Sequence, residues 1–144
     1  MGFFDWLLKS SVKPQRSPNQ PPAPETPKLP VAGNVCFLDI DGVLHPGCSE
    51  TLKYLPNLYR VLDEHPTFNI VICSNWRETA SFEYLQSLFA VSYRHRVVDI
   101  TPSLSSTPGS DRRGKEIATF LDRNVGIQNW FILGTVEKTD KIVR

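Results

Sequence analysis

Residues 35–44 carry the sequence VCFLDIDGVL, an apolar run followed by two carboxylates two positions apart and then by a glycine. Such a run is typical of a parallel strand that is buried on both faces. Asp39 and Asp41 come at its C-terminal end, where open α/β sheets bind their ligands. Side chains at positions i and i+2 of an extended segment point the same way, so we expect both carboxylates to face one crevice. Two converging carboxylates suit Mg²⁺ or another hard cation.

The same stretch is also compatible with a simpler interpretation. An Asp-Gly pair between apolar residues is a hairpin signal, and aspartate is common in turns because its side chain hydrogen-bonds nearby backbone. Gly42 fits either case, since it lets the chain turn sharply out of the strand. An EF-hand calcium loop is excluded because Val43 stands where the third ligand belongs.

Length and composition indicate one domain in a reducing compartment. A chain of 144 residues fits a single domain, and a net charge of +1 excludes neither nucleic acid nor small anionic substrates. Cys36, Cys48 and Cys73 are an odd number without metal-ligand spacing. Cys36 and Cys73 fall in predicted strands, where a reduced cysteine packs as a small apolar group. We therefore expect a cytoplasmic protein without disulfides or structural zinc.

The N-terminal part differs in composition from the rest. Residues 1–13 form a short amphipathic, aromatic segment, and residues 14–33 are a proline-rich linker that we expect to be disordered. The apolar residues 3–8 are too few to span a bilayer and follow no cationic region, so no transmembrane segment or signal peptide is expected. They either dock on a protein or membrane surface or pack loosely on their own domain. The folded domain is predicted at 34–144.

Strands and helices alternate along that domain. After the first strand, a helix is expected to start near Ser49 or Thr51, or only at Pro56, and to end before Pro66. Further strands are expected at 68–73, 97–100 and 129–133, and further helices at about 79–89 and 111–124. This alternation predicts an α/β fold, a three-layer, Rossmann-like parallel sheet with helices on both faces.

Two segments carry a family resemblance. Residues 37–44, FLDIDGVL, resemble motif I of the haloacid dehalogenase (HAD) superfamily, a strand followed by Asp-x-Asp-Gly. Residues 71–77, VICSNWR, resemble its motif II, a strand ending in Ser or Thr. The Ser-x-Trp-Arg form, with Arg-Gly-Lys-Glu-Ile at 113–117, is similar to small HAD domains associated with RNA repair. The resemblance covers roughly residues 34–135 and implies a HAD-type fold.

The resemblance implies a role for each motif residue. In such enzymes the first aspartate attacks phosphorus, which would make Asp39 a covalent nucleophile. Asp41 would protonate the leaving oxygen and later deprotonate water. Ser74 would hydrogen-bond a phosphoryl oxygen, and a basic residue at the start of a later helix would balance transition-state charge. Lys115 and Arg113 both fit that role, and a solvated helix start is the alternative for both.

Three further residues are expected to contact the substrate: Gly42, Asn75 and Arg77. The guanidinium of Arg77 has the fork of donors that clamps a phosphate, although a surface salt bridge would explain it equally well. Trp76 is expected to pack in the core or at its rim, and stacking on a nucleobase is the alternative.

The expected cofactor is Mg²⁺, held by Asp39, Asp41 and Glu137. In the HAD superfamily one or two aspartates directly follow the last of these strands, whereas this chain has Gly134-Thr135 there. Losing a carboxylate weakens a site that must offset charge between a phosphoryl group and an anionic nucleophile. Glu137 would replace it if the loop folded back, and Asp140 is the alternative.

Only about eight loop residues separate the first strand from its helix, so we expect a minimal cap domain or none. By resemblance, uncapped members act on large substrates such as phosphorylated proteins or nucleic-acid ends. The basic residues at 94–96 and 112–113 add charge that fits phosphates. The leading hypothesis is therefore a Mg²⁺-dependent phosphatase with an aspartyl-phosphate intermediate. The alternatives are a degenerate domain that binds phosphate, nucleic acid or a protein, and a sugar transferase, for which the chain is small.

Overall fold

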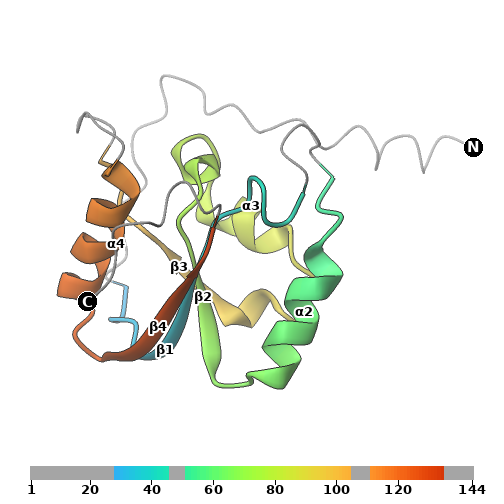
Figure 1. Ribbon diagram of the computed structural model, residues 1–144, viewed down its shortest axis with the longest axis horizontal. Coiled ribbons are helices and arrows are strands. Elements are labelled where there is room, and N and C mark those ends of the chain that lie inside the picture. Colours follow the sequence, from blue (N-terminus) through green and yellow to red (C-terminus); the bar gives the residue numbers. More distant parts are fainter. Residues whose placement is uncertain (1–27, 46–50, 105–110, 135–144) are drawn as a thin grey trace, which may run out of the picture.

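The computed structural model describes residues 28–45, 51–104 and 111–134, which form a four-stranded parallel sheet with helices on both faces (Figure 1). The strand order is β3-β2-β1-β4, so the strand that carries the two aspartates lies inside the sheet. The strands are β1 (Gly33–Leu38), β2 (Phe68–Ile72), β3 (Val97–Ile100) and β4 (Ile127–Leu133). The predicted three-layer, Rossmann-like α/β fold is confirmed.

The carboxyl ends of the strands are level with one another. Leu38 of β1 is in register with Ile72 of β2 and Leu133 of β4. The ladder continues one step further, since the Asp39 N–H donates to Leu133 (2.8 Å) and the Cys73 N–H donates to Leu38 (2.9 Å). The residues that follow β1 and β2 are therefore brought to one edge of the sheet.

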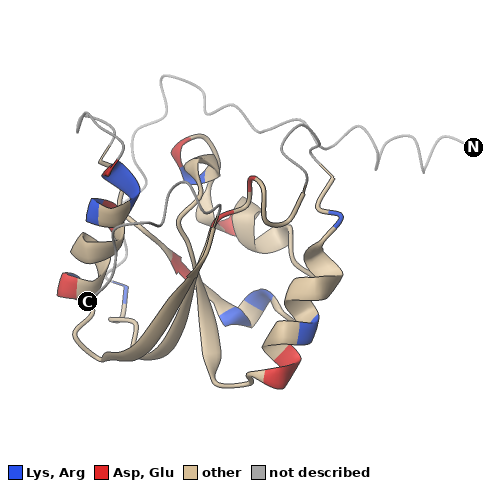
Figure 2. Cartoon of the chain, in the orientation of Figure 1, with Lys and Arg blue, Asp and Glu red and all other residues tan. Residues whose placement is uncertain are grey.

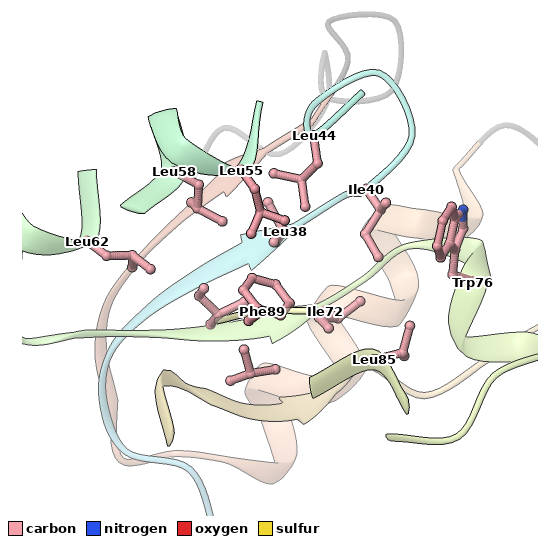
Figure 3. Packing of buried hydrophobic residues seen from close by; sticks show 12 residues of the cluster. Leu38, Ile40, Leu44, Leu55, Leu58, Leu62, Ile72, Trp76, Leu85 and Phe89 are labelled. Carbon is pink, nitrogen blue, oxygen red and sulfur yellow. The ribbon is translucent and has the colours of Figure 1, made fainter. Parts of the chain in front are cut away.

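Two apolar clusters lie on opposite faces of the sheet and hold the helices to it. Consecutive side chains of a strand alternate between faces, so Phe37 enters one cluster and Leu38 the other. The larger cluster (Figure 3) lies under α2 (Leu55–Glu64) and α3 (Phe82–Ser87), and the smaller under α4 (Arg112–Arg123). In the smaller cluster the Phe37 ring meets Phe120 edge-on, with ring centroids 5.7 Å apart.

The helices follow the sequence prediction in two places and depart from it in one. Helix α2 carries Pro56 in its first turn and ends at Glu64, and α4 lies within the predicted 111–124. The helix expected at about 79–89 is present but shorter, because α3 spans Phe82–Ser87. A 3₁₀ helix, η2 (Asn75–Glu78), comes first, and α3 starts only after Ser81, whose side chain accepts a hydrogen bond from the Tyr84 N–H (3.2 Å). An N-cap of this kind fixes where a helix begins, which the apolar spacing alone did not show.

The packed part of the chain begins before β1. The Val31 N–H donates to the Asn124 side chain at 2.7 Å, and Lys28 forms an ion pair with Asp99 at 3.0 Å. Residues 28–33, which the sequence assigned to the linker, thus contact the domain. The segment 1–13 and the remaining linker residues 14–27 lie outside the described residues. Among the helices of the described ranges, none has the length and apolarity needed to cross a membrane.

Candidate functional site

Asp39 and Asp41 follow β1 at the carboxyl edge of the sheet. Asp39 is buried, with 3% of its surface exposed, whereas the Asp41 side chain is half exposed. The chain then turns at Gly42, whose φ of +79° is favourable only for glycine, and the Leu44 N–H closes the turn onto the Ile40 carbonyl (3.0 Å). Gly42 therefore shapes the turn, and its expected substrate contact stays a prediction.

The buried carboxylate of Asp39 lies beside a guanidinium from α4. Arg113 Nη1 is 3.4 Å from Asp39 Oδ2, and Arg113 also donates to the Cys73 sulfur (3.4 Å) and to Asn75 Oδ1 (3.2 Å). Burial by itself disfavours the charged guanidinium, but Cys73 and Asp39 outweigh that effect and raise the pKa of Arg113. Arg113 therefore stays cationic next to the predicted nucleophile.

The structure distinguishes between the two basic residues that the sequence left open. Arg113 reaches Asp39, while Lys115, two residues further along α4, is exposed. In Figure 2 the start of α4, coloured for its basic residues, lies at the same end of the fold as the carboxyl ends of the strands. Geometry thus favours Arg113 for the charge-balancing role.

Asp41 is held by two nitrogen groups at one of its oxygens. Trp76 Nε1 donates to Asp41 Oδ1 at 3.0 Å, and His45 Nε2 is 2.9 Å from the same oxygen. His45 is buried and its ring lies 6.0 Å from the Trp76 ring. Sequence reasoning missed His45, although its position four residues after Asp41, just beyond a predicted turn, was the available signal.

Ser74 and Asn75 follow β2, the strand beside β1. Ser74 is fully buried, and its hydroxyl accepts a hydrogen bond from the Trp76 N–H (3.4 Å) at the start of η2. Asn75 is exposed and its carbonyl oxygen accepts from Arg112 and Arg113, both at 3.2 Å. The first two motifs and the start of α4 are thus brought together, as the sequence predicted.

Arg77 is not placed for the ligand contact expected of it, whereas Trp76 packs in the core as expected. The Arg77 side chain is 1% exposed, donates to four backbone carbonyls and pairs with the buried Glu116. Arg77 therefore forms neither the expected phosphate clamp nor a surface salt bridge, because its donors are used inside the protein. Trp76 belongs to the core cluster (Figure 3) and is 7% exposed, so packing explains it rather than base stacking.

Two carboxylates are available for a metal ion in the part of the chain that the structure describes. Mg²⁺ is commonly held by one or two carboxylates together with waters and substrate phosphates, and Asp39 and Asp41 fit that pattern. Within residues 28–45, 51–104 and 111–134, no three His, Cys, Asp or Glu side chains could hold an ion by themselves. Gly134 brings no carboxylate, and Glu137 and Asp140 lie outside the described residues. The donors fit a Mg²⁺ that is shared with substrate.

One family model matches most of the chain. It is described as the HAD domain in Swiss Army Knife RNA repair proteins, and it matches residues 35–141. The chain belongs to this family. The comparisons with curated proteins and with solved structures found no match. The family supports a small HAD-like domain, as the resemblance implied, and at a coarse level a HAD-type hydrolase, a class that generally uses Mg²⁺.

Proposed function

We propose that this HAD domain is a phosphoric monoester hydrolase that works through an aspartyl-phosphate on Asp39. The observation that carries the proposal is the pairing of the buried Asp39 with the Arg113 guanidinium, next to a second carboxylate that water can reach. A nucleophilic carboxylate that attacks a phosphate dianion needs positive charge close by, since both reactants are anionic.

The reaction divides between the two aspartates. A carboxylate oxygen of Asp39 attacks phosphorus, and the bond from phosphorus to the leaving oxygen breaks as Asp41 gives that oxygen a proton. Asp41 then takes a proton from a water molecule whose oxygen attacks the phosphoryl group. In this step the bond from phosphorus to the Asp39 oxygen breaks, which releases inorganic phosphate, restores the Asp39 carboxylate and leaves Asp41 protonated for the next cycle. Arg113 balances charge on the phosphoryl oxygens, and Ser74 is proposed to hydrogen-bond one of them.

Asp39, Asp41 and Glu137 are the residues proposed to hold Mg²⁺. When bound there, the ion would offset the negative charge that gathers between the nucleophile and the phosphoryl group. The two carboxylates at the sheet edge support this assignment, while the part played by Glu137 stays a prediction.

The proposed substrate is a large phosphorylated molecule, with a phosphorylated RNA end as the first candidate. The family description associates this HAD domain with RNA repair. The described parts of the connection between β1 and α2, residues 39–45 and 51–54, are turns and loop, which supports an open site with little or no cap. Arg112 at the start of α4 is partly exposed and pairs with Glu78 at 3.2 Å, and a neighbouring phosphate is proposed to compete for this guanidinium.

The test compares wild type with Asp39→Asn, using p-nitrophenyl phosphate and RNA oligonucleotides that carry a 3′- or a 5′-terminal phosphate, each with and without Mg²⁺. Wild type is expected to release phosphate and Asp39→Asn to release none. Asp122→Asn, at the far end of α4 and exposed, is the control that keeps activity. A wild type that is inert with every substrate and metal would refute the proposal.

A non-catalytic phosphate-binding domain is the second candidate. It is favoured by Gly134, which stands at the position where a metal-holding aspartate is expected after β4. In this case the oligonucleotides would bind without hydrolysis, and Arg113→Met would weaken binding. Turnover by the purified wild-type protein would dismiss this candidate.

A further inference from the structure

Arg77 and Glu116 form an ion pair that is almost completely shielded from water. The exposed fractions of their side chains are 1% and 0%. Bringing two charges into a protein interior carries a large desolvation penalty, and an apolar pair of similar volume often stabilises a fold equally well. Stability alone therefore gives no reason for a charged pair at this position.

The guanidinium of Arg77 ties together the ends of two strands. Its Nη1 donates to the carbonyls of Cys73 (3.0 Å) and Ser74 (2.7 Å), directly after β2. Its Nε and Nη2 donate to Thr101 (3.1 Å) and Pro102 (3.3 Å), directly after β3. Four hydrogen bonds and the ion pair with Glu116 leave the planar guanidinium little rotational freedom.

Glu116 connects the ion pair to helix α4, of which it is part. Its Oε1 accepts a hydrogen bond from the Leu104 N–H (2.9 Å) and lies 3.6 Å from Arg112 Nε. Residues three apart on a helix share a face, so fixing Glu116 also fixes the direction of Arg113 one turn earlier. Arg113 contacts both Asp39 and the sulfur of Cys73, the residue whose carbonyl Arg77 holds. The pair thus links Ser74, the residue predicted to bind a phosphoryl oxygen, with the helix turn that carries Arg113.

We propose that the Arg77–Glu116 pair is a positioning device that sets the start of α4 against the end of β2, so that Arg113 and Ser74 meet the same phosphoryl group on Asp39. The inference rests on the proposed phosphatase function and adds two positioning residues to it. A displacement of about 1 Å at a reacting centre can reduce turnover about a hundredfold, so a fixed helix start has a direct effect on rate.

The first experiment measures kcat and KM of Glu116→Gln with p-nitrophenyl phosphate and Mg²⁺. Glutamine keeps the shape of the side chain and an oxygen for the Leu104 N–H, but it removes the charge that holds Arg77. We expect kcat to fall about tenfold and KM to change less than about twofold, since the lost alignment matters most in the transition state. Arg77→Lys, which keeps the charge without the planar fork, is expected to retain only part of the wild-type kcat.

A matched control separates positioning from loss of stability. Leu62→Ala removes a buried side chain of α2 in the cluster on the opposite face of the sheet, and it is expected to lower the melting temperature at least as much as Glu116→Gln. Its kcat below the melting transition should stay within about twofold of wild type. Equal losses of kcat in the two variants would overturn the proposal.

A double-mutant cycle tests whether Glu116 acts through Arg113. If it does, Glu116→Gln should lower kcat about tenfold in the wild-type background and less than about twofold in the Arg113→Met background. Additive effects would overturn the proposal while leaving the phosphatase function in place. A wild-type protein without phosphatase activity would instead refute the proposed function, and this inference with it.

Discussion

Replacing Arg113 with methionine removes the cation beside Asp39 and keeps an unbranched side chain of similar reach. The Arg113 side chain is 11% exposed and the Asp39 side chain 4%, so water screens their interaction only weakly. The pKa of Arg113 is raised, because Cys73 and Asp39 outweigh the opposing effect of burial, so the group is charged throughout the working pH range.

The strength of the interaction between Arg113 and Asp39 follows from the distance between them. At 3.4 Å and an effective dielectric constant of about 20, two unit charges interact by about 5 kcal/mol, part of which is offset by desolvation of the guanidinium. Removing one donor from a site that stabilises developing negative charge typically lowers kcat about 100- to 1,000-fold. We expect a loss in this range for Arg113→Met.

Lys115→Met provides the comparison, because Lys115 is on the same helix but exposed. Its kcat should remain within about twofold of wild type, since an exposed charge is screened by water and salt. The assay is steady-state hydrolysis of p-nitrophenyl phosphate with Mg²⁺, with thermal unfolding as a check that each variant is folded. A large loss in Lys115→Met together with a small one in Arg113→Met would refute the assignment of Arg113.

Two further predictions concern the core and Asp41. The pKa of the Cys36 thiol is raised from 9.0 to about 12 by burial, with the nearby Cys73 adding to the shift. As the pH rises, the thiol therefore ionises in the unfolded chain before it does in the folded protein. The stability that the neutral Cys36 thiol contributes is complete below pH 9 and is lost between pH 9 and 12, at up to about 1.4 kcal/mol per pH unit. Urea unfolding of wild type and Cys36→Ala should show a steeper alkaline decline for wild type, and parallel curves would contradict this. Trp76→Phe keeps an aromatic ring but removes the indole N–H that donates to Asp41 Oδ1. It should reduce hydrolysis of phenyl phosphate about fivefold more than hydrolysis of p-nitrophenyl phosphate, whose better leaving group needs less help from an acid. Equal losses with the two substrates would show that the Trp76 contact does not serve proton transfer.

The carboxyl ends of β1 and β2 could be located from the sequence because their signals are local. An apolar run that ends in Asp39 and Asp41 has few favourable positions in a protein, since an unpaired buried carboxylate is strongly disfavoured. Parallel strands joined by helices then place every strand end at the same edge, so Ser74 could be assigned to the neighbourhood of Asp39 without coordinates. For the start of α2 the sequence left two choices, near Ser49 or Thr51 or only at Pro56, and the structure has the second, with the proline in the first turn.

The role of Arg77 could not be predicted in this way. Its ligands are backbone carbonyls of residues 73–74 and 101–102 and the carboxylate of Glu116, and none of these contacts leaves a pattern in the sequence around residue 77. The same holds for His45, whose contact with Asp41 depends on how the turn after β1 folds.

The sequence by itself determined the order of strands and helices, the edge at which the aspartates lie and the family to which the motifs belong, because hydrophobic periodicity and short motifs act over a few residues. Only the tertiary structure decided that Arg113 rather than Lys115 meets Asp39, and that Arg77 is buried rather than open to a phosphate. Both depend on how α4 is rotated against the ends of β2 and β3. Contacts between residues about 40 positions apart in the chain, such as Arg77 with Glu116, join these parts of the fold, and no local pattern in the sequence encodes them.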